Sequence, residues 1–329
     1  YLSEWTKNIF KDEDNDILNY LDEDGYQIEP ENYKPILPMV LINGAEGIGS
    51  GWSTGIPQYD TKEVIRVIEN KLNDKRSNMI HPKFNGFKGK VIKDDETGNY
   101  TTVGTFERLN SNYFKVTELP VGTWTQNYKN YLDKLIETKY IKDYTDNSTE
   151  ESVDIKINIS RETLEKLSDD ADLIKKFKLE NNLYVSNMHL FVDGKITKFS
   201  SPMEIIDIYF DKRLADYSSR KTVLLEKLKS HCDKLENMVK FIKLVISGTL
   251  IISNRKKADI EKDLEKHQLM KIEDSYNYLL GMSIYSLTKE KVDELNKQYK
   301  DKMDEHKKLK GTTPEQLWLN DIEELKSKI

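Results

Sequence analysis

Four glycines surround one apolar residue, Ile48, in the segment PMVLINGAEGIGSGWSTGIP at residues 38–57. They are Gly44, Gly47, Gly49 and Gly51. Glycines permit tight turns and the close approach of a backbone to a ligand, but no lysine follows them as a phosphate-binding loop requires. An isoleucine at the tip of such a loop must pack against something. It either packs beneath its own loop or acts as a wedge that unstacks base pairs and bends a duplex.

Patterns for a self-contained active site are missing from the sequence. The five histidines are scattered, without metal-ligand spacing or partner cysteines, so no metal site is expected. Neither G-x-S-x-G nor a Walker A motif is present. The acids between Asp12 and Glu23 have partial calcium-loop spacing, but Ile17 occupies the position that requires glycine. We therefore expect this chain to bind no cofactor and to contain no catalytic residue.

The charge of the chain is unevenly distributed. The formal net charge is −6, yet residues 1–32 carry ten acids against two bases, and residues 62–90 carry eight bases against three acids. Because the local field decides what a charged ligand meets, the basic stretch either lines a phosphate path or forms an ordinary solvated surface. No run approaches the ~18 apolar residues of a membrane span, so no membrane partner is expected. The single cysteine, Cys232, excludes a disulfide scaffold.

The pattern of apolar residues predicts an α+β fold. Short β-prone runs alternate with turns over residues 83–160, and the other elements expected in the first 200 residues are an acidic helix over 4–24, a buried strand over 36–42, and helices over 61–72, 123–136 and 161–167. After Pro202 the chain reads as helical. Two long helices, about 203–247 and 286–312, predict an antiparallel coiled-coil arm, with a small helical domain of about 248–285 at its tip.

Several motifs closely resemble the type IIA DNA topoisomerases of eukaryotes and large DNA viruses. The first is EPENYKPILPMVLINGAEGIGSGWSTGIPQYD, and the others follow in family order: FNGFKGKV, VTELPVGTWTQNYK, FKLENNLYVSNMHLF, YNYLLGMSIYSLTKEKVDEL and PEQLWLNDIEEL. The resemblance covers essentially the whole chain. It implies that residues 1–32 are the C-terminal part of a winged-helix domain, that 33–200 form a DNA-bending tower domain, and that 201–329 form coiled-coil arms with an exit gate.

The resemblance assigns roles to individual residues. It implies that Ile48 intercalates into the gate DNA, that Trp124 touches this DNA, and that Lys83, Lys88 and Lys90 contact its phosphates. Gly122 stands where many members have an arginine, which removes one cationic contact. The exit gate is expected to join two copies of the chain through an apolar surface, although the same side chains also fit a private core. They are Ile246, Leu250, Ile251, Tyr276, Leu279, Leu280 and Met282.

The parent enzyme implied by the resemblance is an ATP-dependent topoisomerase that uses Mg²⁺. It cuts both strands of double-stranded DNA, passes a second duplex and reseals the break. Leu2-Ser3 matches a Leu-Ser that follows the family's Arg-Tyr pair, so the nucleophilic tyrosine is expected just upstream of Tyr1. The metal-binding and ATPase domains are likewise expected outside this chain.

Location and function class follow from the same resemblance. The expected location is the nucleus for a cellular eukaryotic protein, and the host cytoplasm, viral factory or virion for a viral one. The alternative from a different class is a non-enzymatic architectural DNA-bending protein or coiled-coil scaffold.

Overall fold

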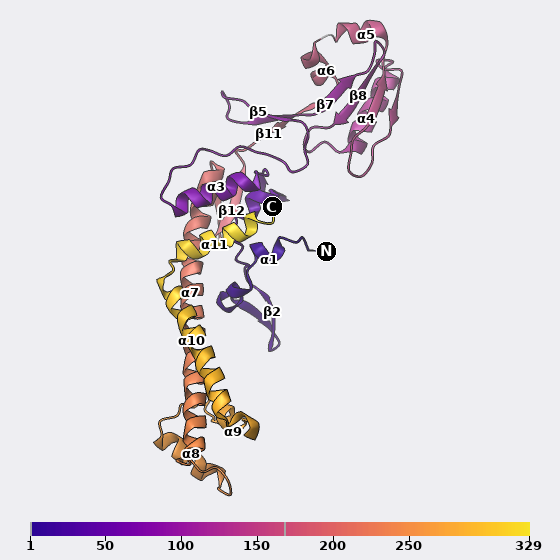
Figure 1. Cartoon of the computed structure of the whole chain (residues 1–329). Helices are drawn as coiled ribbons and strands as arrows, with labels where there is room; N and C mark the ends of the chain where they lie inside the picture. The colour runs from indigo at the N-terminus through magenta and orange to yellow at the C-terminus, as the bar shows by residue number, and fades with distance from the viewer. Residues whose placement is uncertain (1, 168) are drawn as a thin grey trace. The chain divides into compact units, whose positions relative to one another are not determined.

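The computed structural model describes residues 2–167 and 169–329 (Figure 1). The chain forms two compact units. Unit 1 combines Tyr1–Ile36 with Asp211–Ile329, and unit 2 is Leu37–Phe210. Helices and small antiparallel sheets occur together, which confirms the α+β class. The division into winged-helix, tower and coiled-coil parts stays a prediction.

Unit 2 contains the sheets that position the glycine-rich segment. A four-stranded sheet has the order β7-β8-β10-β9 and a three-stranded sheet the order β11-β6-β5, while β3–β4 and β12–β13 are hairpins. The strands are β3 Ala45–Gly49, β4 Trp52–Ile56, β5 Lys90–Lys93, β6 Tyr100–Val103, β7 Thr105–Arg108, β8 Tyr113–Glu118, β9 Asp143–Asp146, β10 Ile155–Asn158, β11 Glu180–Leu183, β12 Met188–Val192 and β13 Lys195–Phe199. The helices are α2 Met39–Asn43, α3 Thr61–Leu72, α4 Thr125–Glu137, α5 Arg161–Lys166, α6 Asp170–Lys176 and the first residues of α7, Pro202–Ile246.

One core cluster of unit 2 lies on one face of the four-stranded sheet. Alternate residues of β8 and β10 are buried there, because successive side chains of a strand point to opposite faces. Phe114 of β8 meets Phe177 edge to face, with ring centroids 4.6 Å apart. Leu132 of α4 is fully buried in the same cluster. This core fixes the start of α4, where Trp124 lies.

Unit 1 is mainly helical. Its elements are α1 Thr6–Ile9, a 3₁₀ helix Asp12–Ile17, β1 Tyr20–Glu23, β2 Tyr26–Pro30, the rest of α7, α8 Lys257–Lys266, α9 Asn277–Leu280, a 3₁₀ turn Ile284–Ser286, α10 Lys289–Gly311 and α11 Pro314–Lys326. α10 lies alongside α7 (Figure 1). Near α8 and α9, Ile242 of α7 and Leu295 of α10 share one buried cluster. Both predicted long helices are therefore present, the second from Lys289 to Gly311.

Two predicted elements are wrong. The helix over residues 4–24 is replaced by α1, the 3₁₀ helix and the β1–β2 hairpin. The hairpin turns at Asp24 and Gly25, which have φ of +53° and +82°. An Asp-Gly pair adopts this conformation readily and favours a hairpin over a continuing helix. The strand over 36–42 is instead the short helix α2, which buries Leu41. A run of four apolar residues does not distinguish a buried strand from a buried helical turn.

The predicted exit-gate surface is partly core. Leu250, Tyr276 and Leu279 are buried together with side chains of α7 and α10, so these three follow the private-core interpretation. Ile246 and Ile251 are exposed. The Tyr276 hydroxyl donates a hydrogen bond of 3.1 Å to the Leu269 carbonyl inside this core. The exposed apolar side chains of this region are therefore fewer than the sequence indicates.

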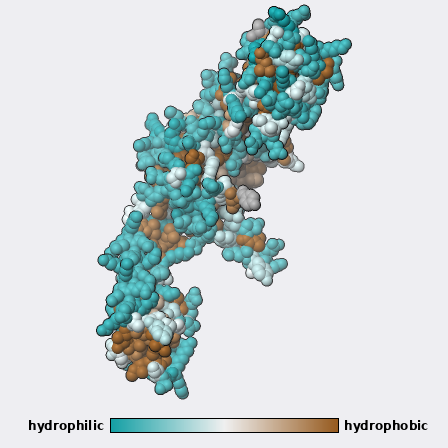
Figure 2. All heavy atoms as spheres, turned by 45° about the vertical axis from the view of Figure 1, so that its right-hand side comes forward, coloured by the Kyte–Doolittle hydropathy of each residue, from teal (hydrophilic) through white to brown (hydrophobic). Residues whose placement is uncertain are grey.

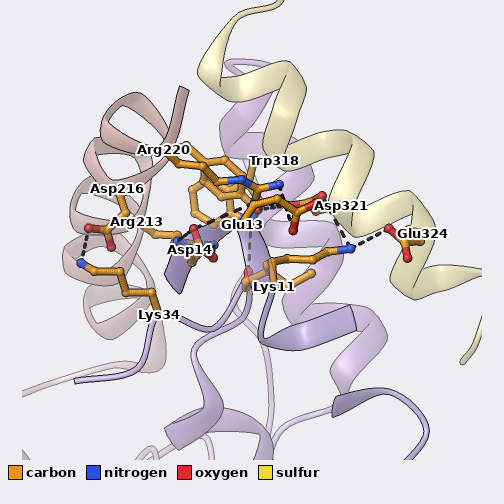
Figure 3. Close-up of polar contacts among 12 residues, drawn as sticks. Lys11, Glu13, Asp14, Lys34, Arg213, Asp216, Arg220, Trp318, Asp321 and Glu324 are labelled. Atoms are coloured by element: carbon orange, nitrogen blue, oxygen red, sulfur yellow. Dashed lines mark hydrogen bonds and ion pairs between the residues drawn. The ribbon is translucent and has the colours of Figure 1, made fainter. Parts of the chain in front are cut away.

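A buried network of charges in unit 1 ties the N-terminal segment to α7 (Figure 3). Arg213 of α7 donates to both oxygens of Asp14, at 2.7 and 3.3 Å. Arg220, about two helical turns further on, donates at 2.7 Å to Asp321 of α11 and lies 4.0 Å from Asp14. Burial alone lowers the pKa of Arg220, but the charges of Asp321 and Asp14 outweigh it and raise that pKa above its ordinary value.

Further contacts extend the network over α11. The Tyr217 hydroxyl donates to Asp321 at 2.8 Å, and its ring stacks on Trp318 with centroids 5.4 Å apart. The Trp318 indole N–H donates to the Ile36 carbonyl at 3.0 Å, and Lys11 Nζ lies 2.6 Å from Glu324. These partners are separated by up to 313 residues along the chain. The network therefore joins the N-terminal segment of unit 1 to its last helix, α11.

Candidate functional site

Ile48 lies near the tip of the β3–β4 hairpin. The strands pair from Ala45 opposite Ile56 to Gly49 opposite Trp52. Ser50 and Gly51 form the turn, where Gly51 has a φ of +87° that favours glycine. The Ile48 side chain is 89% exposed, so it does not pack beneath its own loop. An isoleucine held this far into solvent loses hydrophobic stabilisation until a partner covers it.

The glycines of the segment serve different purposes. Gly44 has a φ of +70°, and a Cβ there would lie 2.9 Å from the Ile56 carbonyl oxygen, so the fold itself requires glycine. Added Cβ atoms at Gly47 and Gly49 would meet neighbours only at 3.8 and 3.7 Å, which are ordinary contacts. The fold does not need these two glycines. They leave the opposite face of β3 without side chains on either side of Ile48.

A cavity of about 570 Å³ opens on the Ile48 face of the hairpin. Glu46, Ile48 and Ser53 share this face, because paired and alternate residues of a hairpin point to the same side. Across the cavity, Asn181 of β11 donates from Nδ2 to the Val121 carbonyl at 2.9 Å. The lining therefore combines apolar side chains with amide groups and main chain opposite the exposed isoleucine.

Trp124 lies close in sequence to two residues that line the same cavity. Val121 and Gly122 line the cavity, and Gly122, at a φ of +82°, sits in a turn closed by a 3.0 Å bond from the Thr123 N–H to the Pro120 carbonyl. Trp124 follows as the residue before α4 and is 77% exposed. The structure therefore brings Ile48 and the Gly122 turn to one cavity. Trp124 itself does not line it.

Lys83 is engaged within the protein. Its ammonium group forms an ion pair with Asp60, and its backbone N–H donates to the Gln58 carbonyl at 2.8 Å. Asp60 also caps α3 by accepting from the N–H groups of Lys62 and Glu63. Burial alone raises the pKa of Asp60, but the hydrogen bonds from Lys83 and from these backbone groups outweigh it and hold that pKa below its ordinary value. Lys83 is therefore less available to a phosphate than its sequence position indicates.

Lys88 and Lys90 differ from Lys83. Both are exposed, and neither ammonium group forms an ion pair with the residues that the structure describes. The Lys88 backbone N–H donates to Glu118 at 3.2 Å, and Lys90 begins β5 opposite Val103 of β6. These anchored backbones present two cations without an ion pair among the described residues, at or just before β5, the edge strand of the three-stranded sheet.

Sequence reasoning missed residues that surround the hairpin. Asn181 and Asn187 line the cavity, and His189 touches β4. They lie within FKLENNLYVSNMHLF, about 130 residues beyond the glycines, so spacing along the chain gives no sign of the contact. The asparagine-rich composition of that motif was the available signal, because amides suit a polar groove.

Two general properties complete the description of the site. Among residues 2–167 and 169–329, no group of three or more His, Cys, Asp or Glu side chains could hold a metal ion. In the same described part of the chain, no helix is both long enough and apolar enough to cross a bilayer.

Comparison with known proteins gives matches along nearly the whole chain. The family model for the A subunit of DNA gyrase/topoisomerase IV matches residues 1–323. DNA topoisomerase 2 of Arabidopsis thaliana is 36% identical over 369 residues, which cover 98% of this chain and 25% of that protein. DNA topoisomerase 2-alpha of Gallus gallus is 35% identical over 357 residues, which cover 98% of this chain and 23% of that protein.

A solved structure matches as well. The DNA-binding, cleavage and re-ligation domain of Plasmodium falciparum topoisomerase II has 34% sequence identity and a TM-score of 0.90, over 99% of this chain and 48% of that one. This chain spans about a quarter of the length of the curated relatives.

Proposed function

The chain belongs to the type IIA DNA topoisomerase family that includes the A subunit of DNA gyrase/topoisomerase IV, and we propose that it bends and holds the duplex that such an enzyme cleaves. The observation that carries this proposal is Ile48, an exposed apolar side chain near the tip of a glycine-rich hairpin beside a cavity. Apolar wedges of this kind unstack a base step and kink a duplex. Ile48 is the intercalating residue in this proposal, and Trp124 contacts the same DNA.

Energy considerations favour a wedge combined with phosphate contacts. Smoothly bending a short duplex costs about 1–6 kcal/mol. Covering an exposed isoleucine with bases regains about 1.5–3 kcal/mol, and lysines that neutralise phosphates supply further binding free energy by releasing counterions. Lys88 and Lys90 are the proposed phosphate contacts, with a smaller contribution from Lys83.

The activity proposed for the whole protein is ATP-dependent relaxation and decatenation of DNA, by transient double-strand breakage and duplex passage. ATP and Mg²⁺ are the cofactors of that activity, and we assign neither to a residue of this chain. Within the chain, residues 1–32 are proposed as the end of a winged-helix domain, 33–200 as the tower, and 201–329 as coiled-coil arms with an exit gate. The curated relatives named above are eukaryotic, and a nuclear location is proposed.

Binding of duplex DNA at varied salt tests this function. We expect Lys88→Ala and Lys90→Ala each to weaken binding and to reduce the slope of log affinity against log salt by about one. Lys83→Ala should change the slope less, because Asp60 already pairs with that ammonium group. The measurement is fluorescence anisotropy of a labelled duplex between about 50 and 200 mM salt.

Lys307→Ala, at an exposed position of α10, is the matched control and should leave the slope unchanged. Equal effects at Lys83, Lys88, Lys90 and Lys307 would contradict the assigned phosphate path. Failure of the chain to bind duplex DNA at low salt would favour the alternative of a coiled-coil scaffold.

Dimerisation through unit 1 is proposed on exposed apolar side chains. Ile251, Ile284 and Tyr285 are solvent-exposed, Tyr285 by 94%. Figure 2 shows apolar atoms gathered over the end of unit 1 that carries α8 and α9. Exposed contiguous apolar patches mark interaction sites. A second copy of this chain is the proposed partner, which makes the patch the exit gate between two protomers.

We expect Ile284→Asp to shift the chain from dimer to monomer, because the new carboxylate would be buried without a partner in the interface. Sedimentation velocity at micromolar concentration measures this directly. Ile92→Asp, at an exposed isoleucine of β5, is the control and should stay dimeric. A monomeric wild-type chain, or a dimeric Ile284→Asp variant, would contradict the proposed gate.

A further inference from the structure

The hairpin that carries Ile48 needs external support to work as a wedge. An isolated two-stranded hairpin is only marginally stable in water. Gly47, Gly49, Gly51 and Gly55 add backbone freedom to this one. Unstacking a base step costs free energy, so the DNA pushes a wedge that enters the stack back outward. A hairpin free to pivot would yield to that force, and Ile48 would stay outside the stack.

β12 borders the outer edge of β4. The Gly55 N–H donates to the Asn187 carbonyl at 2.9 Å, as in a continuing sheet ladder. Asn187 Nδ2 donates to the Ser53 hydroxyl at 2.9 Å. Ser53 is the residue directly opposite Ile48 in the hairpin. The second contact therefore holds the strand position that faces the wedge.

Thr54 makes the central link to β12. Its hydroxyl donates to the His189 carbonyl at 2.8 Å and accepts from the His189 N–H at 3.1 Å. A single side chain thus satisfies both backbone groups of one β12 residue. The Trp52 ring meets the His189 ring edge to face, with centroids 5.6 Å apart. Four consecutive residues of β4, Trp52 to Gly55, are therefore attached to β12 or to the residue that precedes it.

β12 itself is firmly held. It pairs with β13 over five residue pairs, from Met188 opposite Phe199 to Val192 opposite Lys195. Met188 and Phe199, the pair nearest the chain ends of this hairpin, are both buried. Asp193 and Gly194 form the turn with positive φ at both positions, the arrangement whose twist suits a two-residue hairpin. A rigid neighbour of this kind transmits support to β4.

We propose that Thr54 and Asn187 are positioning residues that fasten the wedge hairpin to β12 and so keep Ile48 in the base stack. This inference rests on the proposed function, because it assigns a role in bending. In this proposal the two residues act through the hairpin and β12 rather than by contacting the bases. Their contribution is to resist rotation of the hairpin when the duplex pushes on Ile48.

Thr54→Val tests the proposal with almost no change of shape. Valine lacks the hydroxyl, so the His189 carbonyl loses its donor and the His189 N–H loses its acceptor. At saturating protein, we expect the ratio of bent to straight duplex to fall about 30-fold, the factor that loss of two neutral hydrogen bonds produces. Affinity for the duplex at low salt should stay within about twofold, because phosphate contacts dominate it. End-to-end fluorescence transfer measures the bend, and anisotropy measures the affinity.

Thr54→Ser is the matched control, because it keeps the hydroxyl and should bend the duplex like the wild type. Ser53→Ala removes only the acceptor of Asn187 at an exposed position. It tests the same brace, by which we mean the attachment of β4 to β12 and Asn187, if Thr54→Val unfolds. It should lower the ratio of bent to straight duplex by a smaller factor. A purely structural role would lower the thermal midpoint of Thr54→Val and leave the bend at saturation unchanged. That result overturns the proposal.

Ile48→Ala, measured in parallel, separates the brace from the wedge. If Ile48→Ala loses the bend while folded Thr54→Val and Ser53→Ala keep it, the brace is refuted and the proposed function survives. If Ile48→Ala also keeps the bend, the proposed function fails and the brace fails with it. If Ile48→Ala and Thr54→Val lose the bend but Thr54→Ser keeps it, both are supported.

Discussion

Replacing Asp321 with alanine is expected to lower the free energy of unfolding by about 3–5 kcal/mol, the cost of breaking a buried ion pair. Its carboxylate accepts from Arg220 at 2.7 Å and from the Tyr217 hydroxyl at 2.8 Å. The Arg220 side chain is only 6% exposed, so water does not replace the lost partner. The variant thus leaves a buried guanidinium and a buried hydroxyl without their shared acceptor.

Urea unfolding followed by circular dichroism measures this change. Asp321→Asn keeps the shape and one acceptor, so it should destabilise less than the alanine variant. Glu305→Ala breaks an exposed ion pair with Lys302 on α10 and should cost less than about 1 kcal/mol. If Asp321→Ala lowers the free energy of unfolding as little as Glu305→Ala does, the claim that this network stabilises unit 1 is refuted.

Replacing Ile48 with alanine is expected to abolish most of the bend while duplex binding persists. The change removes three carbon atoms from the proposed wedge, worth about 2 kcal/mol of apolar burial in the stack. This amount lowers the ratio of bent to straight complexes by a factor of about 30. Binding to straight DNA continues because lysine contacts to phosphates do not depend on the wedge.

The measurement is end-to-end fluorescence transfer on a doubly labelled duplex at saturating protein. Ile48→Leu keeps the apolar volume and should retain most of the bend. Ile92→Ala removes an exposed isoleucine elsewhere in unit 2 and should have no effect. An unchanged bend in Ile48→Ala would show that something other than this side chain deforms the duplex.

Elements with strong local signals could be predicted from the sequence. The helix over residues 61–72 is confirmed at both ends, because Asp60 caps its start and its buried residues follow a helical period. The strands β5–β8 and β10 are likewise found within the predicted β-prone runs. The helix predicted over 4–24 was wrong, since acidic residues of that segment pair with basic residues of α7. Asp14, for example, pairs with Arg213, which lies 199 residues away.

The candidate site could likewise be predicted from the sequence only in part. The glycines beside Ile48 single it out in the sequence, but they leave open whether it packs beneath its own loop, and the structure shows it exposed. The opposite wall of the cavity depends on Asn181 and the turn at Gly122, which are joined by the hydrogen bond from Asn181 to the Val121 carbonyl. The reduced availability of Lys83 depends on Asp60, 23 residues earlier. Such pairings are set by tertiary packing, which single-residue patterns do not encode.

The central claim is that Ile48 enters the base stack, and unstacking reports this most directly. A set of duplexes carries the fluorescent base 2-aminopurine at successive positions, because its emission rises when its neighbours unstack. With the wild-type chain at saturation, we predict a rise confined to one step, and no rise with Ile48→Ala. A duplex that is bound and bent by the wild-type chain without brightening at any position would contradict the claim.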